Sequence, residues 1–496
     1  MDYLTLVSGS DVRGAALGEH ALLTPEVGRR IGQAFCQYLH TLGLECPRIN
    51  VGRDPRLSGE ALEAAIAEGM QSAGAQVTVF GLCTTPAMYM SLITGKGGDA
   101  AVMVTASHLP WERNGYKFFL PDGGITSSVL KKILALANSD EDFSRAGGTL
   151  STDQYLPIYT ELLRNVMCER CQSGDRPLTG LHVIVDAGNG AGGFYAELLG
   201  SLGANTEGSQ FLEPDGHFPN HIPNPENEAA MDSISQAVLR SHADLGVIFD
   251  TDCDRAAIVD SEGREINRNR LIALISAVLL REQPGATIVT DSVTSSGLAE
   301  FIRAHGGVHH RFKRGYRNVI DEAARLRELG QNAPLAIETS GHAALQENHN
   351  LDDGMYLVTR LLCEAVRLQK EGKSLSSLIA DLREPAESRE IRLTLTDADF
   401  KPAGQRAIDL VTAVANENPD WHVAPDNHEG IRVSFDIQSP DSTWFLLRLS
   451  LHDPVLPINF ESDVKGGIAP VARKLYDVLK TCDGIDFSAF DALLNA

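Results

Sequence analysis

The apolar positions of this chain follow one pattern three times. In residues 48–80, 181–211 and 286–312, a short apolar run leads into a turn, a stretch with helical periodicity and a second apolar run, which is weaker in 181–211. Apolar strands joined by a helix are typical of a parallel sheet that helices cover. The pattern predicts three α/β domains of similar build. One large doubly wound domain is the alternative, but the breaker-rich stretches 139–152 and 214–225 between the repeats favour three.

The C-terminal part follows another pattern. After Pro385 the sequences RLTL, GIRVSF and WFLLRLSL alternate apolar and polar positions, and a helical stretch covers 468–479. Such alternation is typical of an antiparallel sheet with one covered face, so we expect a fourth, α+β domain. At about 150 residues per domain, a chain of 496 residues accommodates three to four domains. We predict domains at 1–150, 151–262, 263–380 and 381–496.

Charge and composition exclude several classes of partner. The chain has 43 Lys and Arg against 66 Asp and Glu, a net charge of −23, and its 43% hydrophobic residues are ordinary for a globular protein. So much negative charge repels phosphate backbones and anionic lipid, so we expect neither nucleic acid nor membrane as a partner. No secretory signal and no apolar run of transmembrane length is present, which predicts a cytoplasmic protein. An anionic substrate would have to meet a local concentration of positive groups.

The eight cysteines are scattered along the chain and do not form a disulfide framework. Cys168 and Cys171 form one C-x-x-C, but no second pair lies at the spacing of a zinc site. We therefore interpret this pair as two small residues of a helix in a reduced protein, with a zinc or redox site as the alternative.

The first segment with candidate chemistry follows the apolar strand AAVMV, which leads into TASH. Ser107 therefore lies at the carboxyl end of a strand, where ligands gather in open α/β sheets. His108 and Lys117 are close in sequence and could supply an acid, a base or a positive field. Pro110 and Gly115 predict that the stretch after the serine is irregular. A solvated turn is the alternative, since Ser and His are common turn residues.

A second segment, LGVIFDTDCDR, places Asp250, Asp252 and Asp254 after another apolar strand and before Arg255. Three carboxylates so close together repel one another, and a hard divalent cation relieves that repulsion. Ligands that are all oxygen favour Mg²⁺ or Ca²⁺ over Zn²⁺. An EF-hand is excluded, because Arg255 and Ser261 stand where its loop needs Gly and Glu. A solvated acidic turn is the remaining alternative.

A third segment, LAIETSGHAAL, runs from an apolar strand into a polar loop that contains Glu338, Ser340 and His342. A carboxylate, a hydroxyl and an imidazole together are suited to holding sugar hydroxyls. The alternative is that Thr339 or Ser340 caps the N-terminus of a helix.

The fourth segment is WFLLRLSLHDP. Arg448 and Ser450, two apart on the expected strand, would face the same side and could bind a phosphate. A surface ion pair is the alternative for Arg448. The four segments come from the four expected domains, which predicts a central cleft between domains.

In combination, these segments resemble the motifs of the α-D-phosphohexomutase superfamily, the bacterial phosphomannomutase/phosphoglucomutase and phosphoglucosamine mutase enzymes. The resemblance covers essentially the whole chain, with the motifs in family order. TASHLP and NGYK correspond to the serine loop, DTDCDR to the metal loop, IETSGH to the sugar loop and RLSLHDP to the phosphate loop. Arg13, in DVRG, matches an N-terminal arginine of the family.

The resemblance implies interconversion of hexose 1-phosphate and hexose 6-phosphate, of mannose, glucose or both, through a phosphorylated Ser107 and a bisphosphorylated sugar. It implies one Mg²⁺ held by Asp250, Asp252, Asp254 and the group on Ser107, and a hexose 1,6-bisphosphate as activator. Arg255 would neutralise charge on the transferring group.

The remaining roles also follow from the resemblance. Lys117 would take the proton of the attacking hydroxyl, and His108 would orient or stabilise. The substrate would be bound by residues of three segments: Arg13, Glu338, Ser340, His342, Arg448 and Ser450. The expected partners are small hexose phosphates, and the expected assembly is a monomer or homodimer.

Departures from the family motifs leave the preferred sugar open. Leu109 replaces Asn in the serine loop, and Leu451-His452-Asp453 replaces hydroxyl-bearing residues of the phosphate loop. Tyr316, after an added Arg314, stands where many relatives have His. A phosphoglucosamine mutase, a metal-dependent sugar-phosphate phosphatase and a non-catalytic sugar-phosphate binding protein are the alternatives.

Overall fold

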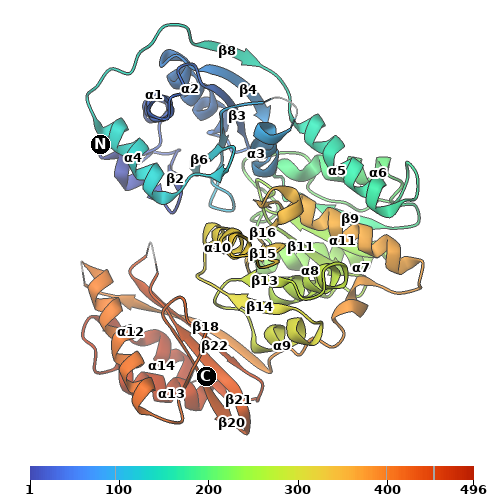
Figure 1. Cartoon of the computed structure of the whole chain (residues 1–496), viewed down its shortest axis with the longest axis vertical. Coiled ribbons are helices and arrows are strands. Elements are labelled where there is room, and N and C mark those ends of the chain that lie inside the picture. Colours follow the sequence, from blue (N-terminus) through green and yellow to red (C-terminus); the bar gives the residue numbers. More distant parts are fainter. Residues whose placement is uncertain (95–96, 398, 451–452, 496) are drawn as a thin grey trace. The chain divides into compact units, whose positions relative to one another are not determined.

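The computed structural model describes residues 1–94, 97–397, 399–450 and 453–495 (Figure 1). The chain forms two compact units. Unit 1 comprises Met1–Val278 and Ser340–Leu378, and unit 2 comprises Leu279–Thr339 and Ile379–Ala496. Mixed α/β sheets precede an antiparallel sheet in the C-terminal part, which confirms the predicted fold class. The four domain boundaries stay a prediction, and the third expected domain has residues in both units.

The first sheet of unit 1 has the strand order β1-β2-β6-β5-β3-β4-β8, with β7 paired to β6. β3, β4, β5 and β8 are parallel, as the strand–helix–strand repeat predicts, and β6 runs antiparallel beside β5. The strands are β1 (Val7–Ser8), β2 (Asp11–Ala15), β3 (Arg48–Arg53), β4 (Gln76–Leu82), β5 (Ala100–Val104), β6 (Arg113–Leu120), β7 (Gly123–Gly124) and β8 (Thr149–Thr152).

β6 corrects one expectation. Pro110 and Gly115 were expected to keep this stretch irregular, yet Gly115 lies inside a buried strand that also carries Lys117. A Cβ on Gly115 would lie 2.1 Å from the carbonyl oxygen of Val12 on β2, so the missing side chain lets the two strands approach. Glycine thus acts here as a close-packing residue rather than as a strand breaker.

Helices α1 (Pro25–Thr41), α2 (Gly59–Ser72) and α4 (Ser127–Asn138) contribute buried residues to the core of this sheet. Thr24 is the N-cap of α1, and its hydroxyl accepts a hydrogen bond from the N–H of Val27. α1 and α2 pack closely because Gly32 and Gly69 have no side chains. α3 (Thr85–Ile93) and α5 (Leu156–Cys171) complete this part.

The second sheet of unit 1 has the order β12-β11-β10-β9, formed by β9 (Val183–Asp186), β10 (Leu245–Phe249), β11 (Ala256–Asp260) and β12 (Glu265–Ile266). β9 and β10 are parallel, and β10 and β11 form an antiparallel hairpin. The closing strand expected near 205–211 does not form; Asn205 and Gln210 make only isolated bridges to this sheet. Gly208, at φ +92°, turns the backbone between them.

The helices around this sheet are α6 (Phe194–Ser201), α7 (Glu228–Ser241) and α11 (Gly354–Gln369), and a short hairpin of β16 (Ala343–Leu345) and β17 (Leu351–Asp352) precedes α11. α8 (Arg268–Glu282) begins in unit 1 and ends in unit 2. Cys168 and Cys171 lie in the last turn of α5. All eight cysteines are free, and no metal-binding group in the described part of the chain contains one. The interpretation as a helical pair is confirmed.

Unit 2 contains the third strand–helix–strand repeat. β13 (Thr287–Thr290) pairs in parallel with β14 (Val308–Arg311) and with β15 (Leu335–Ile337), and the helices are α9 (Ser296–Ala304) and α10 (Tyr316–Glu328).

The C-terminal sheet of unit 2 is antiparallel, with the order β19-β20-β21-β22-β18-β23. Helices α12 (Phe400–Glu417), α13 (Ile468–Leu479) and α14 (Ser488–Asn495) cover one of its faces (Figure 1). Its strands are β18 (Glu387–Leu395), β19 (His422–Val423), β20 (Ile431–Ile437), β21 (Ser439–Leu447), β22 (Val455–Ser462) and β23 (Ile485–Asp486). α13 coincides with the helix predicted at 468–479.

Arg448 and Ser450 were expected on a strand, but β21 ends at Leu447. Both residues therefore lie in the loop that follows it. A loop position suits a binding role better, because the strand residues before it are buried in the core.

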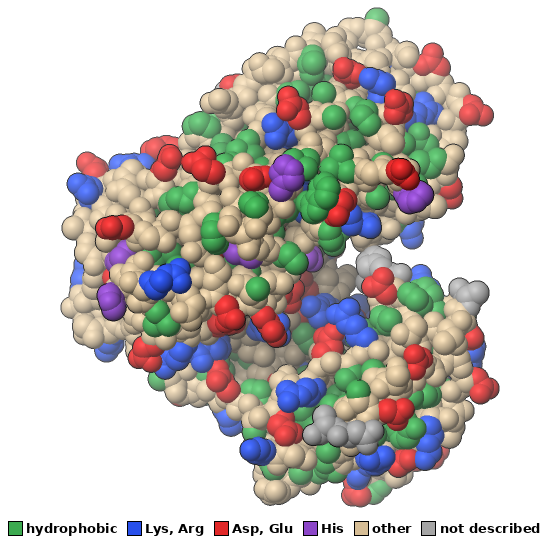
Figure 2. All heavy atoms as spheres, turned by 180° about the vertical axis from the view of Figure 1, so that it is seen from behind, with side chains coloured by type: hydrophobic (Ala, Val, Ile, Leu, Met, Phe, Trp, Pro, Cys, Tyr) green, Lys and Arg blue, Asp and Glu red, His purple; other side chains and the backbone are tan. Residues whose placement is uncertain are grey.

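The surface in Figure 2 has acidic, basic and hydrophobic side chains interspersed over the face in view. The net charge of −23 is therefore not gathered into one acidic patch on this side. None of the helices in the described ranges has the length and apolar character needed to cross a bilayer.

The α1–α2 contact yields a prediction. Alanine normally stabilises a helix interior by about 1 kcal/mol over glycine. A Cβ on Gly69, however, would lie 2.1 Å from the carbonyl oxygen of Arg29. We expect Gly69→Ala to lower the free energy of unfolding by about 1 to 3 kcal/mol, measured by urea titration. Gly200→Ala in α6 is the control, because its nearest neighbour is 3.7 Å away, and it should not destabilise. Equal stability of Gly69→Ala and wild type would contradict this packing.

Candidate active site

The acidic loop is the turn of the β10–β11 hairpin. Asp250, Asp252 and Asp254 are each at most 1% exposed. The N–H of Cys253 donates to the Asp250 carbonyl oxygen, which closes the turn. Burial excludes the solvated acidic turn that the sequence left open.

Positive and hydroxyl groups from other elements meet these carboxylates. Lys117, from β6, donates to Asp252 Oδ2 at 2.8 Å and to Asp254 Oδ2. Thr85, at the start of α3, donates its hydroxyl to Asp252 Oδ2 at 2.6 Å. The first sheet of unit 1, which contains β6, and the β10–β11 hairpin of the second sheet are thus joined through this cluster.

Burial acts on every charged group of the cluster. Burial, reinforced by the Asp254 carboxylate, raises the pKa of Asp250 well above its usual value. Burial alone would also raise the pKa of Asp252, but the Lys117 ammonium and hydrogen bonds from Lys117 and Thr85 outweigh it and hold that pKa low. The Asp252 and Asp254 carboxylates outweigh the effect of burial on Lys117 and keep its pKa well above the usual value.

Ser107 faces this cluster and is 7% exposed, which excludes the solvated turn. Its hydroxyl donates to Asp250 Oδ2 at 2.9 Å and accepts from Arg255 Nη2 at 3.1 Å. Its φ of +51° lies in the left-handed region that non-glycine residues rarely adopt. Such strain is typical of functional sites, where the surroundings hold the residue in place.

Arg255 and His108 also contact the serine hydroxyl. Arg255 Nη2 also donates to Asp250 Oδ2 at 3.0 Å and contacts His108 Nδ1. Burial, followed by the positive charge of Arg255, lowers the pKa of His108 to about 3, so the imidazole is neutral and accepts a hydrogen bond. This agrees with an orienting role for His108.

The serine loop has a support that our sequence reasoning missed. Arg56 is 1% exposed and donates to the carbonyl oxygens of Ser107, Leu109, Pro110 and Arg113. Its guanidinium carbon also lies 5.3 Å from the ring centroid of Phe218. One side chain therefore binds four carbonyl groups of the loop.

Asp54 completes this support. Its Oδ2 lies 3.3 Å from Arg56 Nε and accepts the hydroxyl hydrogen of Thr105 at 2.6 Å. The Thr105 hydroxyl in turn accepts the N–H of Ser107 at 2.8 Å. The sequence held a signal for these residues, because Asp54 and Arg56 directly follow β3 and so lie at the strand edge where Ser107 lies.

Three further predicted residues lie at this site. Arg13 donates to the Thr105 carbonyl oxygen at 2.8 Å and to Asp11 Oδ2 at 2.8 Å. His342 Nε2 lies 3.6 Å from Asp254 Oδ1, and His342 Nδ1 shares a hydrogen bond of 2.9 Å with Ser340. Unit 1 therefore brings these three residues to the serine and acidic loops.

The donor set fits a hard divalent cation. Asp250, Asp252 and Asp254 each offer a carboxylate oxygen, and these oxygens lie within 4.8 Å of one another. Asp252 Oδ1 and Asp254 Oδ1 are buried without a hydrogen-bond partner in the described structure. Buried carboxylate oxygens rarely stay unpaired, and oxygen ligands are those that Mg²⁺ and Ca²⁺ prefer.

Unit 2 carries the other predicted residues. Glu338 accepts the N–H of Gly315 at 2.6 Å. No helix begins at Thr339 or Ser340 in the described chain, so the capping alternative is wrong; Thr339 donates its hydroxyl to Asp291 at 2.7 Å.

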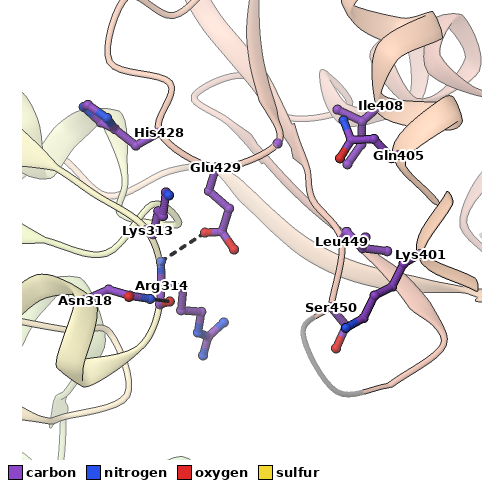
Figure 3. A pocket seen from close by; sticks show the side chains of 11 residues that line it. Lys313, Arg314, Asn318, Lys401, Gln405, Ile408, His428, Glu429, Leu449 and Ser450 are labelled. Atoms are coloured by element: carbon purple, nitrogen blue, oxygen red, sulfur yellow. Dashed lines mark hydrogen bonds between the residues drawn. The ribbon is translucent and has the colours of Figure 1, made fainter. Parts of the chain in front are cut away.

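Unit 2 contains a cavity of about 520 Å³ (Figure 3). Ser450 lines it, as does Glu429, whose Oε1 lies 3.9 Å from Arg448. The Arg448 side chain is 11% exposed, so it is not a surface ion pair. Leu451 and His452, the departures in this loop, lie outside the described residues.

Comparisons with known proteins agree with this geometry. Three family models match: domain I of the phosphoglucomutase/phosphomannomutase α/β/α domains at residues 5–143, domain II at 157–263 and domain III at 267–385. The chain is 30% identical to a phosphomannomutase/phosphoglucomutase of Pseudomonas putida, over 95% of this chain and 94% of that protein.

Two more relatives extend the comparison. A phosphoglucomutase of Neisseria gonorrhoeae is 28% identical over 95% of this chain and 96% of its own. The crystal structure of a phosphoglucomutase/phosphomannomutase family protein from Burkholderia thailandensis superposes with a TM-score of 0.79 at 29% identity, over 97% of this chain and 98% of that one.

The support of the serine loop yields a prediction. Thr105→Val keeps the shape of the side chain but leaves the buried Asp54 carboxylate and the Ser107 N–H without this partner. We expect the free energy of unfolding to fall by about 1 to 3 kcal/mol. Thr105→Ser, which keeps the hydroxyl, should retain most of the stability. Urea unfolding of both variants checks this, and a Thr105→Val protein as stable as wild type would show that the hydrogen bonds do not support the loop.

Proposed function

This chain belongs to the phosphoglucomutase/phosphomannomutase family of α-D-phosphohexomutases, and from that premise we propose that it moves a phosphoryl group between O1 and O6 of a hexose. The observation that supports this most is the position of the Ser107 hydroxyl. It contacts both Asp250, one of three buried carboxylates, and the Arg255 guanidinium, and Arg56 binds the backbone that carries it.

We propose the following transfer. In the phosphorylated enzyme, the bond between phosphorus and Ser107 Oγ breaks as the free hydroxyl of a hexose monophosphate attacks. A hexose 1,6-bisphosphate forms, and the proton of the hydroxyl is taken up by the protein. The bisphosphate turns over and returns its other phosphoryl group to Ser107. Free bisphosphate would therefore act as the activator that phosphorylates the serine.

Charge neutralisation and positioning do most of the catalytic work in such a transfer. Mg²⁺ bound to Asp250, Asp252 and Asp254 would supply electrostatic stabilisation of the transferring group. Arg255 would bind oxygens of that group, and His108 would keep the guanidinium in place.

Lys117 is the proposed proton acceptor. With its two carboxylate partners it is firmly protonated, and a proton acceptor must be neutral. A divalent cation held by those carboxylates would weaken this pairing and lower the pKa of Lys117. Lys117 would then be able to take the proton of the sugar hydroxyl.

Binding residues complete the proposal. We assign Arg13, Glu338, Ser340 and His342 to the sugar, whose hydroxyls must be recognised in both orientations. Arg448 and Ser450 would bind the phosphate that is not being transferred.

Side-by-side assays decide the substrate. The 1-phosphates of glucose, mannose and glucosamine should be tested with Mg²⁺ and a trace of the matching 1,6-bisphosphate. We expect 6-phosphate to form from glucose or mannose 1-phosphate. Turnover of glucosamine 1-phosphate alone would identify a phosphoglucosamine mutase, and release of inorganic phosphate without isomerisation would identify a phosphatase.

The phosphoserine yields a prediction. After incubation with glucose 1,6-bisphosphate, phosphopeptide mapping should find the phosphoryl group on Ser107. Ser107→Ala should lose nearly all mutase activity and keep its melting temperature. Ser128→Ala, at an exposed serine of α4, is the matched control and should still be labelled at position 107. Labelling of another residue in wild type would refute this mechanism.

The carboxylate cluster yields another. Chelation should abolish turnover, and Mg²⁺ should restore it better than Ca²⁺, which tolerates looser geometry. Asp252→Asn, which removes one charge at nearly constant shape, should weaken Mg²⁺ binding about tenfold or more. Calorimetric titration of Mg²⁺ measures this, with Asp175→Asn at an exposed carboxylate as the control. Wild-type affinity and activity in Asp252→Asn would mean that the cluster is not the metal site.

A further inference from the structure

The cavity of unit 2 has an unusual charge for so acidic a chain. It is lined by three full cations, Lys313, Arg314 and Lys401, together with His428 and a single carboxylate, Glu429. That carboxylate already accepts the N–H of Arg314 at 3.0 Å and the hydroxyl of Ser292 at 2.7 Å. The cavity therefore concentrates positive charge against a net charge of −23, as an anion site requires.

Lys401 lies outside all the sequence motifs described above. It lies in the first turn of α12, is exposed, and makes no ion pair or hydrogen bond with any described residue. Figure 3 shows its side chain reaching from the helix toward Ser450. The ammonium group is thus available to a ligand in the cavity.

The packing of α12 fixes where Lys401 lies. Gly404, one turn further along the helix, has no side chain, and a Cβ there would lie 2.4 Å from Leu449 Cδ1. Leu449, next to Arg448 and Ser450, therefore packs directly on the helix. Residues three apart share a helix face, so Lys401 lies beside the same loop.

This loop has lost donors that the family motif leads one to expect. The sequence RLSLHDP has Leu451-His452-Asp453 where relatives carry hydroxyl-bearing residues. A lysine ammonium offers three donors and a full positive charge. A cation from a neighbouring helix can therefore do what side chains of the loop do elsewhere.

We propose that Lys401 is a binding residue for the phosphate that is not being transferred, acting beside Ser450 in place of the missing loop hydroxyls. This rests on the proposed function and deepens it, because it names a residue that determines how tightly this chain binds the substrate phosphate.

Lys401→Met tests the proposal, since it keeps the length of the side chain and removes its charge. We expect kcat/KM for the hexose phosphate to fall about tenfold, mainly through KM, as the loss of one charge-assisted hydrogen bond implies. The Kd for inorganic phosphate, measured by calorimetry, should weaken by a similar factor. Lys401→Arg, which keeps a donor cation, should recover most of both.

The control is Arg406→Met, which removes the other cation of the same helix. Arg406 is exposed and lies 3.8 Å from Asp397, and it does not line the cavity. This variant should bind phosphate and turn over like wild type. An equal loss in Arg406→Met would show a general effect of charge and would overturn the proposal, as would an unchanged Kd and KM in Lys401→Met.

The proposed function and the role of Lys401 can be disproved separately. If wild type isomerises no hexose phosphate, the proposed function is wrong, and the phosphate titration still tests Lys401. If wild type is an active mutase and Lys401→Met matches it in both measurements, only the assignment of Lys401 is wrong.

Discussion

Burial of three carboxylates within one turn is the constraint on which the rest of unit 1 depends. Asp250, Asp252 and Asp254 lie in the hairpin of one sheet, and a buried charge without a partner costs several kcal/mol. Lys117 and Thr85, which compensate this charge, belong to the other sheet and its helix. The two sheets of unit 1 must therefore meet at this point, and Ser107 is carried to the same place by β5, the strand that pairs with the strand of Lys117.

Holding the serine there has its own cost, because Ser107 has a left-handed backbone. Strain of this kind amounts to about 1 to 3 kcal/mol and persists only where neighbouring groups fix it. Arg56 and the Asp54–Thr105 pair do so through the backbone of the loop, so the hydroxyl itself stays available. Support and chemistry are thus assigned to different residues. In the proposed mechanism, Ser107 would change between hydroxyl and phosphate ester while these backbone contacts stay in place.

Periodicity predicted much of the fold, because the buried strands are apolar along their length and the helices have clear apolar faces. It failed where tertiary packing overrides local preference. Gly115 belongs to a strand because a neighbouring backbone approaches too closely for any side chain, which no local signal reveals.

The site divides in the same way. Ser107 and the three aspartates were found because strand ends collect ligands and adjacent carboxylates demand compensation. Arg56 was missed although it follows a strand. Its partners are backbone carbonyl groups, which every residue has, so the sequence contains no signal for these contacts. The prediction that Arg448 lies on a strand was wrong because the alternation of apolar and polar residues continues beyond Leu447, the last residue of β21.

A mutase has to bind a phosphate that arrives on either end of the sugar, and this favours particular kinds of contact. An arginine fork recognises one plane well, whereas an ammonium on a flexible stem is a point charge with rotatable donors. In unit 2 the Arg448 side chain is 11% exposed and lies 3.9 Å from Glu429, while the exposed Lys401 projects from a helix surface. In the proposed roles, the largely buried guanidinium would define one position for the phosphate, and the ammonium on its flexible stem would tolerate two orientations of the sugar attached to it.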